Sequence, residues 1–345
     1  MPRTVGIVLL QLGGPERLTD VAPFLRNLFA DPDLIPVPGG PRLRRALAWM
    51  IGTARAYKAR TYYRRIGGGS PLRRLTDEQA RGLEAELGRR VAARGPIDHV
   101  FRAAVAMRYW HPFTGEALDR LVAADALVAL SLFPHYSAAT TGSSLAELGR
   151  ERARRGDTRP LAVIDRWFDA PDYLEALAVR VRRAVERLSP EGREGALILW
   201  SAHGLPQKLV DAGDPYASEV EATVAGVMAR LADLRLPHRL AYQSRTGPIR
   251  WTGPETKKVL REAAAAGRRA VVMVPVSFVS DHIETLYEVD LLYGEEARRL
   301  GIREYLRTES FNGGADLTAV LARLVEDSAA RAGWIGPVLP ASQSA

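Results

Sequence analysis

The chain has 345 residues, 47% of them hydrophobic, so it is too long for one small core and too apolar to be disordered, and two domains are the simplest expectation. No apolar run reaches the ~18 residues that span a bilayer, and the absence of cysteine excludes disulfides and cysteine-ligated zinc or iron–sulfur sites. The net charge of +8 is compatible with nucleic acid, an anionic membrane surface or acidic small ligands, but no nucleic-acid-binding motif is found and no such partner is expected.

The N-terminus enters a strand-like sequence directly. Its first residues read MPRTVGIVLLQLGG, an apolar run without a small-residue cleavage site. We therefore expect no signal peptide and a cytoplasmic location, with any membrane contact peripheral at the inner face.

From that first run onward, short apolar runs alternate with longer segments of helical character. Continuous apolar runs are typical of strands buried on both faces, and their alternation with helices indicates an α/β fold with mostly parallel sheets. Two such sheets, divided near residues 160–170, would account for the length. The expected strands are Val5–Leu12, Val100–Met107, Ala126–Phe133, Leu161–Ile164, Ala196–Trp200, Arg239–Tyr242 and Ala270–Val279. The expected helices are Thr76–Ala93, Gly115–Ala124, Tyr173–Leu188, Tyr216–Leu234, Glu255–Ala266 and Leu317–Ala329.

The segment Pro41–Arg65 differs from this alternation. It combines apolar side chains such as Leu43, Trp49 and Tyr57 with many Arg and Lys residues. Such a composition suits a basic amphipathic helix that lies on a membrane or lines the mouth of a cleft. A solvated helix packed on its own domain is the alternative.

Reactive side chains gather where the expected strands end. In open α/β sheets, ligands bind beyond the carboxyl ends of the strands, so these residues are candidates for a site. Each group taken singly also has an ordinary structural explanation, such as a turn or a helix cap. Together they indicate one cleft to which both sheets contribute. The groups include Gln11-Leu12-Gly13-Gly14, Arg108-Tyr109-Trp110-His111, Pro134-His135-Tyr136-Ser137, Ser201-Ala202-His203-Gly204, Gln243-Ser244-Arg245 and Asp281-His282-Ile283-Glu284.

The stretch Ser277–Asp290, SFVSDHIETLYEVD, is rich in proton- and metal-binding groups. If a helix begins near Asp281, then Asp281, Glu284 and Glu288 share one face. His282 would point away from Glu284 on a regular helix, so either the turn is irregular or the two residues serve different roles. Carboxylates with imidazole suit a transient borderline cation such as Fe²⁺ or Zn²⁺, and also suit proton removal near pH 7. A solvated acidic face is the alternative.

Several longer motifs resemble those of the ferrochelatase family, over nearly the whole chain and in the family's order. They are LFADPDLI, YRRIGGGSP, TTGSS, SAHGLP, YQSRTGPIRW and SDHIETLYEVD. The resemblance implies two similar Rossmann-like domains, each a mostly parallel sheet flanked by helices, with the active cleft between them. The expected domains are 1–165, completed by a C-terminal helix at 315–330, and 166–314, with a loose tail at 336–345.

This resemblance implies the insertion of Fe²⁺ into a porphyrin with release of two protons. His203 matches the family's active-site histidine, which accepts a pyrrole proton, and Glu284 matches the carboxylate facing it across the macrocycle. Both are candidate catalytic residues and metal ligands. Asp281 and Glu288 would form an acidic path for metal or protons, and His282 would support Glu284. Fe²⁺ would be a substrate, with no tightly bound cofactor and no iron–sulfur cluster.

The resemblance also implies a set of porphyrin-binding residues. Arginine suits the propionates because its guanidinium binds a carboxylate through two parallel hydrogen bonds. Leu12 stands where members that use coproporphyrin often have Tyr, which favours protoporphyrin IX and leaves coproporphyrin III as the alternative. Residues 41–57 match the hydrophobic lip of the cleft, which favours a peripheral membrane contact. The porphyrin-binding candidates are Leu12, Arg64, Arg65, Ser70, Arg108, Tyr109, Tyr136, Ser137 and Trp251.

Two other functions remain open from sequence. A sirohydrochlorin-type chelatase would tend to use paired histidines and often a shorter chain. A porphyrin or haem carrier would not need Glu284 opposite His203. The expected partners are protoporphyrin IX and Fe²⁺, and the sequence does not indicate an oligomeric state.

Overall fold

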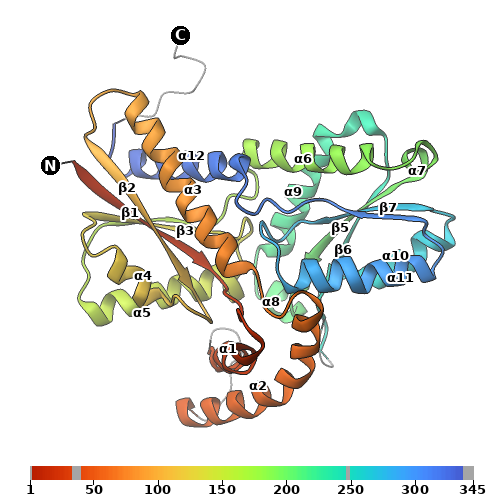
Figure 1. Cartoon of the computed structure of the whole chain (residues 1–345), viewed down its shortest axis with the longest axis horizontal. Coiled ribbons are helices and arrows are strands. Elements are labelled where there is room, and N and C mark those ends of the chain that lie inside the picture. Colours follow the sequence, from red (N-terminus) through yellow and green to blue (C-terminus); the bar gives the residue numbers. More distant parts are fainter. Residues whose placement is uncertain (1, 33–39, 246–248, 337–345) are drawn as a thin grey trace.

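The computed structural model describes residues 2–32, 40–245 and 249–336, which form two four-stranded sheets lying side by side (Figure 1). Neighbouring strands are parallel throughout both sheets. The predicted α/β fold with two mostly parallel sheets is therefore confirmed. The first sheet has the order β2 (His99–Met107), β1 (Arg3–Gln11), β3 (Ala126–Ser131) and β4 (Leu161–Ile164). The second has the order β6 (His238–Gln243), β5 (Leu197–His203), β7 (Ala270–Pro275) and β8 (Glu304–Arg307).

Helices flank both sheets. In Figure 1, α6 and α12 lie above the sheets, and α4, α5, α10 and α11 lie below them. The helices associated with the first half are η1 (Leu18–Asp20), α1 (Val21–Ala30), α2 (Gly40–Arg65), α3 (Leu72–Ala93), α4 (Thr114–Arg120), η2 (Ala138–Gly142) and α5 (Ser143–Arg155). The others are α6 (Pro171–Glu186), α7 (Pro190–Gly195), α8 (Gln207–Asp211), α9 (Tyr216–Arg230), η3 (Ala232–Leu234), α10 (Thr256–Ala265), η4 (Glu284–Tyr293), α11 (Gly294–Arg299) and α12 (Ala315–Arg331).

The sequence located seven of these strands but missed β8. This strand reads Glu-Tyr-Leu-Arg, and all four residues are only partly buried because it forms the edge of its sheet. It therefore lacks the continuous apolar run that marks a central strand. The expected strand Ala270–Val279 is shorter in the structure, where β7 ends at Pro275.

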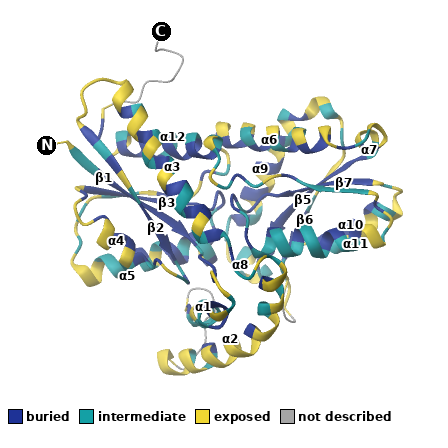
Figure 2. Ribbon diagram, in the orientation of Figure 1, coloured by how far each residue is buried: buried dark blue, intermediate teal, exposed yellow. Residues whose placement is uncertain are grey.

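A shared apolar core joins the two sheets (Figure 2). One buried cluster contains Ile7 from β1 and Trp200 from β5. In the connection between the sheets, Trp167 is 2% exposed and donates from Nε1 to the carbonyl of Ser131 at 2.8 Å. The strand ends of both sheets are therefore held in a fixed relation by continuous packing.

The C-terminal helix α12 packs against α3 and β4 of the first half, although it follows the second sheet in the chain. Its fully buried Glu326 lies 3.1 Å from Arg90 and 2.8 Å from Arg94, both at the end of α3. The expected domain limits at residues 165 and 314 stay a prediction. Residues 337–345 of the expected tail lie outside the described residues.

Candidate active site

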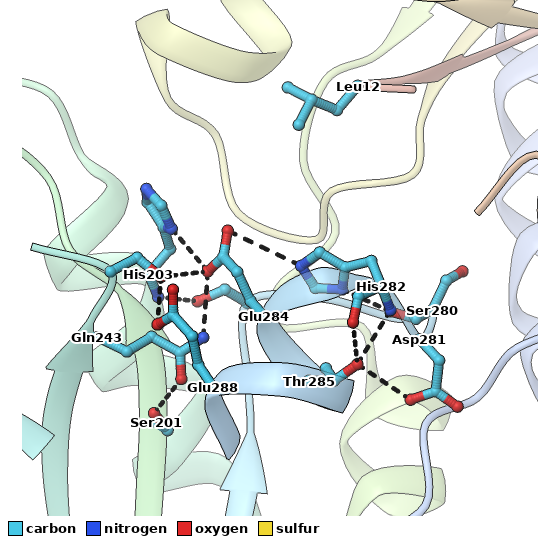
Figure 3. A network of polar contacts seen from close by, with 12 residues as sticks. Leu12, Ser201, His203, Gln243, Ser280, Asp281, His282, Glu284, Thr285 and Glu288 are labelled. Carbon is cyan, nitrogen blue, oxygen red and sulfur yellow. Dashed lines mark hydrogen bonds and ion pairs between the residues drawn. The ribbon is translucent and has the colours of Figure 1, made fainter. Parts of the chain in front are cut away.

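His203 and Glu284 form a pair at the carboxyl end of the second sheet (Figure 3). His203 is the last residue of β5, and its Nδ1 lies 2.8 Å from Oε2 of Glu284. The two side chains touch, so the expectation that Glu284 faces His203 across the macrocycle is wrong for this structure. The main chain of His203 is held on both sides: its N–H donates to Oγ of Ser277 at 3.1 Å, and its carbonyl accepts from the Tyr216 hydroxyl at 3.0 Å. The imidazole is therefore positioned by a central strand, where ligands bind in this class of sheet.

The exit of the neighbouring strand β6 supplies two further donors to Glu284. Gln243 Nε2 and Ser244 Oγ lie 3.1 and 2.8 Å from the same carboxylate oxygen. Oε1 of the Gln243 side chain accepts from the Ser201 hydroxyl at 2.6 Å, which fixes the orientation of the side-chain amide. The sequence placed Gln243 and Ser244 at a strand exit but gave them no role. Their position next to β5 was the available signal.

Glu288 lies beside this pair. Ser244 Oγ is 2.8 Å from Oε2 of Glu288 as well as from Oε2 of Glu284, so the single hydroxyl proton can be donated to only one of these carboxyl groups at a time. Burial and the charge of Glu284 raise the pKa of Glu288 to about 7. Burial alone would raise the pKa of Glu284, but the His203 imidazolium outweighs it and lowers that pKa. Burial would lower the pKa of His203, and the Glu284 carboxylate reverses the direction and raises it. Of these three groups, Glu288 is the one whose raised pKa lies near neutral pH.

Glu284 and Glu288 belong to η4, a π-helix that begins only after Asp281 and His282. The expectation that Asp281 shares a face with both glutamates is therefore wrong, because Asp281 lies before the helix. Its carboxylate binds Arg307 at 3.0 Å and points away from His203 (Figure 3). The structure does not bring Asp281 into the cluster.

His282 approaches Glu284 through this irregular turn, one of the two possibilities left open by the sequence. Its Nδ1 donates to the Ser280 carbonyl at 3.0 Å, and its Nε2 lies 3.9 Å from Oε1 of Glu284. Burial lowers the pKa of His282, and the nearby Glu284 carboxylate opposes part of that effect. Leu12 from the first sheet and His282 line the same cavity of about 20 Å³, so both sheets contribute to this site.

The other predicted porphyrin-binding residues come from several elements of both halves. Trp251 lies beside Gly204, where an added Cβ would meet its ring at 3.5 Å. Tyr136 and Ser137 follow β3, and α9 and the residues before it hold this loop: the Tyr136 N–H donates to Glu219 at 2.6 Å and the Ser137 hydroxyl donates to Asp214 at 2.9 Å. The Ser137 hydroxyl is thus already engaged by the protein. Arg64 is exposed at the end of α2, and Ser70 packs against Gly14.

Three of the predicted residues are bound elsewhere. Arg108 lies 3.0 Å from Asp31, and the Tyr109 hydroxyl donates to the same carboxylate at 2.5 Å. Tyr109 is 1% exposed, so the structure does not bring it to the surface that His203 faces. Arg65 binds Glu295 at 2.8 Å, which joins α2 to α11.

Within the described ranges, no group of three or more His, Asp or Glu side chains is arranged to hold a metal ion. The His203–Glu284 pair offers two ligands of borderline and hard character, and so suits a cation that is held briefly. No helix among the same residues is long and apolar enough to cross a membrane.

The fold resembles that of SirB from Bacillus subtilis, solved with Fe³⁺, with a TM-score of 0.55 and 11% identity over 96% of this chain and 98% of that chain. This two-sheet fold, the imidazole–carboxylate site and the match to a chelatase family model define an enzyme of the metal chelatase class. The family model described as Ferrochelatase matches residues 4–329. Ferrochelatase of Geotalea daltonii is 44% identical over 94% of this chain and 98% of its own length, and that of Synechococcus sp. (strain RCC307) is 46% identical over 94% and 83%. The chain belongs to the ferrochelatase family.

Proposed function

We propose that this protein inserts Fe²⁺ into protoporphyrin IX to give protohaem, the terminal step of haem synthesis. The observation that carries the proposal is the His203–Glu284 pair, with Glu288 beside it, at the end of the central strand β5. Insertion breaks two pyrrole N–H bonds and forms iron–nitrogen bonds, so the site must accept two protons and release a loosely held cation. A site of one imidazole and nearby carboxyls suits both tasks.

His203 is the proposed base. Its Nδ1 is held by Glu284, and the ring is 36% exposed, which leaves Nε2 for the substrate (Figure 3). The Glu284 carboxylate raises the pKa of His203, which favours the imidazolium with both ring nitrogens protonated. His203 can accept a pyrrole proton only when its Nε2 is unprotonated. Ser244 bridges to Glu288, whose pKa of about 7 allows it to take up and return protons near neutral pH.

His203 and Glu284 are also the proposed transient ligands of Fe²⁺, and Glu288 the proposed next group on the acidic path. His282 is the proposed support of Glu284, since its Nε2 lies 3.9 Å from the second oxygen of that carboxylate. Asp281 is left out of the path because its carboxylate is bound to Arg307. The chain contains no cysteine to ligate an iron–sulfur cluster, and we propose that iron is a substrate and that no cofactor is resident.

Protoporphyrin IX is the proposed substrate because Leu12 presents an apolar side chain above the cluster (Figure 3). An apolar residue offers no hydrogen bond to the two extra carboxyl groups of coproporphyrin III. The exposed Arg64 is the proposed propionate ligand, since its guanidinium has a free surface position at the end of α2.

The test is anaerobic mixing of the protein with Fe²⁺ and either porphyrin, followed by the porphyrin spectrum. We expect conversion of protoporphyrin IX by the wild type and none by His203→Ala. Conversion of coproporphyrin III alone would contradict the substrate choice. Tight binding of both porphyrins without conversion of either would indicate a carrier.

A peripheral membrane contact through residues 41–57 is also proposed. Helix α2 exposes Leu43, Trp49, Met50 and Tyr57 alongside its arginines, and an apolar substrate partitions into lipid. Sedimentation with vesicles of phosphatidylglycerol should retain the wild type more than a Trp49→Ser/Met50→Ser variant. Equal retention of the two proteins would contradict this contact.

A further inference from the structure

Helix η4 is bound to both edges of the second sheet. Glu284 binds His203 of β5 and Gln243 of β6. Asp290 binds Arg307, the last residue of β8 at the opposite edge. Arg307 donates from Nε and Nη2 to the two oxygens of Asp290 at 2.7 and 3.1 Å. Its Nη1 lies 3.0 Å from Asp281. One guanidinium therefore binds a carboxylate before η4 and another within it, on either side of Glu284 in the sequence.

Both oxygens of Asp281 are occupied by donors from the protein. Oδ1 accepts from Ser310 at 2.7 Å and from Thr285 at 3.2 Å, and Oδ2 accepts from Asn312 Nδ2 at 2.9 Å. The N–H of Asp281 in turn donates to Asn312 Oδ1 at 2.8 Å. With Arg307 added, four side chains of the protein hold this carboxylate, which fixes the start of η4 and competes with any metal ion for its oxygens.

A second β8 residue binds the same helix. The Tyr305 hydroxyl donates to the carbonyl of Val289 at 2.8 Å. The ion-pair side chains are largely shielded from water, with exposed fractions of 14% for Arg307, 20% for Asp281 and 34% for Asp290. Bidentate, shielded contacts of this kind hold geometry better than exposed pairs do.

Such anchoring matters because a π-helix is rare and less stable than an α-helix. In η4 the π-helical winding brings Glu284 and Glu288 both within 2.8 Å of Ser244 Oγ. Rewinding to an α-helix would change the angle between these two side chains about the helix axis. The contacts from β8 oppose that change.

We infer that Arg307 is a positioning residue, which holds Asp281 and Asp290 so that η4 keeps Glu284 and Glu288 facing His203. Asp281 then acts through helix geometry and carries neither metal nor protons. The inference rests on the proposed iron insertion only for its activity readout.

The first test is hydrogen–deuterium exchange of the η4 amides, which does not depend on activity. Asp290→Asn keeps the side-chain shape and removes the charge, and Arg307→Lys keeps the charge but loses the bidentate contact. Each should make η4 exchange about tenfold faster while β5 is unchanged. The matched control is Asp233→Asn, which breaks another bidentate pair, with Arg182 at 2.7 and 2.9 Å. Wild-type exchange of η4 in both Asp290→Asn and Arg307→Lys would overturn the inference.

The second test separates kcat from porphyrin affinity. In Asp290→Asn and Asp281→Asn we expect kcat for iron insertion to fall by similar factors, about 10-fold, as for residues that orient a first ligand. The Kd for protoporphyrin IX, from fluorescence quenching, should stay within about twofold, because η4 anchoring does not contribute the porphyrin's own contacts. A fall in kcat for Asp281→Asn with wild-type kcat for Asp290→Asn would assign Asp281 to the metal or proton path and overturn the inference. If the wild type inserts no iron, the proposed function fails, and the exchange experiment still decides the role of Arg307.

Discussion

Replacing Glu284 with Gln should lower the pKa of His203. The substitution keeps an oxygen acceptor near Nδ1 of the imidazole but removes the charge that faces it at 2.8 Å. Two unit charges about 4 Å apart interact by about 4 kcal/mol at an effective dielectric constant of 20, and each pKa unit corresponds to about 1.4 kcal/mol. The His203 ring is 36% exposed, so water screens part of this energy. We therefore expect the pKa to fall by about 1–2 units.

The assay is a proton NMR titration of the imidazole resonances without metal. The chain has six histidines, and His203→Ala identifies the resonance of interest. Burial lowers the pKa of His135 to about 3, so its resonance should stay constant above pH 5 in every variant and serve as the internal reference. A His203 pKa that is the same in wild type and Glu284→Gln would refute the ion pair as the source of the shift. An equal fall in Glu288→Gln would assign the shift to the cluster as a whole.

Three further substitutions test the site and its support. Glu288→Gln should stabilise the protein at pH 8 by on the order of 1–3 kcal/mol and change its stability little at pH 4. The folded state raises the pKa of Glu288 from 4.5 to about 7, so ionising this carboxyl as the pH rises from 4.5 to 7 destabilises the wild type. Equal effects of the substitution on urea unfolding at both pH values would contradict this. Gly204→Ala should lower the free energy of unfolding by about 1–3 kcal/mol, because the added Cβ would lie 2.8 Å from the main-chain carbonyl oxygen of Gln243. An unchanged urea midpoint would show that the chain after β5 can move away from the end of β6. Glu326→Gln should lower stability by about 2–4 kcal/mol by leaving Arg90 without its buried partner, while kcat per folded molecule stays the same; a fall in kcat would connect α12 to the site.

The sequence by itself determined the fold class and where the reactive groups would gather. Continuous apolar runs such as Ala126–Phe133 and Ala196–Trp200 are typical of strands buried on both faces of a parallel sheet. The carboxyl ends of parallel strands lie at one edge of the sheet, where ligands bind. His203 could therefore be placed at the site from its position after a strand, and Glu284 from the stretch that follows β7. Burial and periodicity are local properties of the chain, which explains why the fold class could be predicted from them.

Only the tertiary structure decided how those groups are used. Whether Asp281 joins Glu284 depends on the winding of η4, and that winding depends on Arg307, which belongs to an edge strand too short and polar to recognise from sequence. The burial of Tyr109 depends likewise on Asp31, far away in the chain. Contacts between residues distant in sequence leave no periodic signal, because each requires the whole backbone to bring the two partners together. The sequence indicates candidate residues for the site, and packing decides which of them reach it and which face one another there.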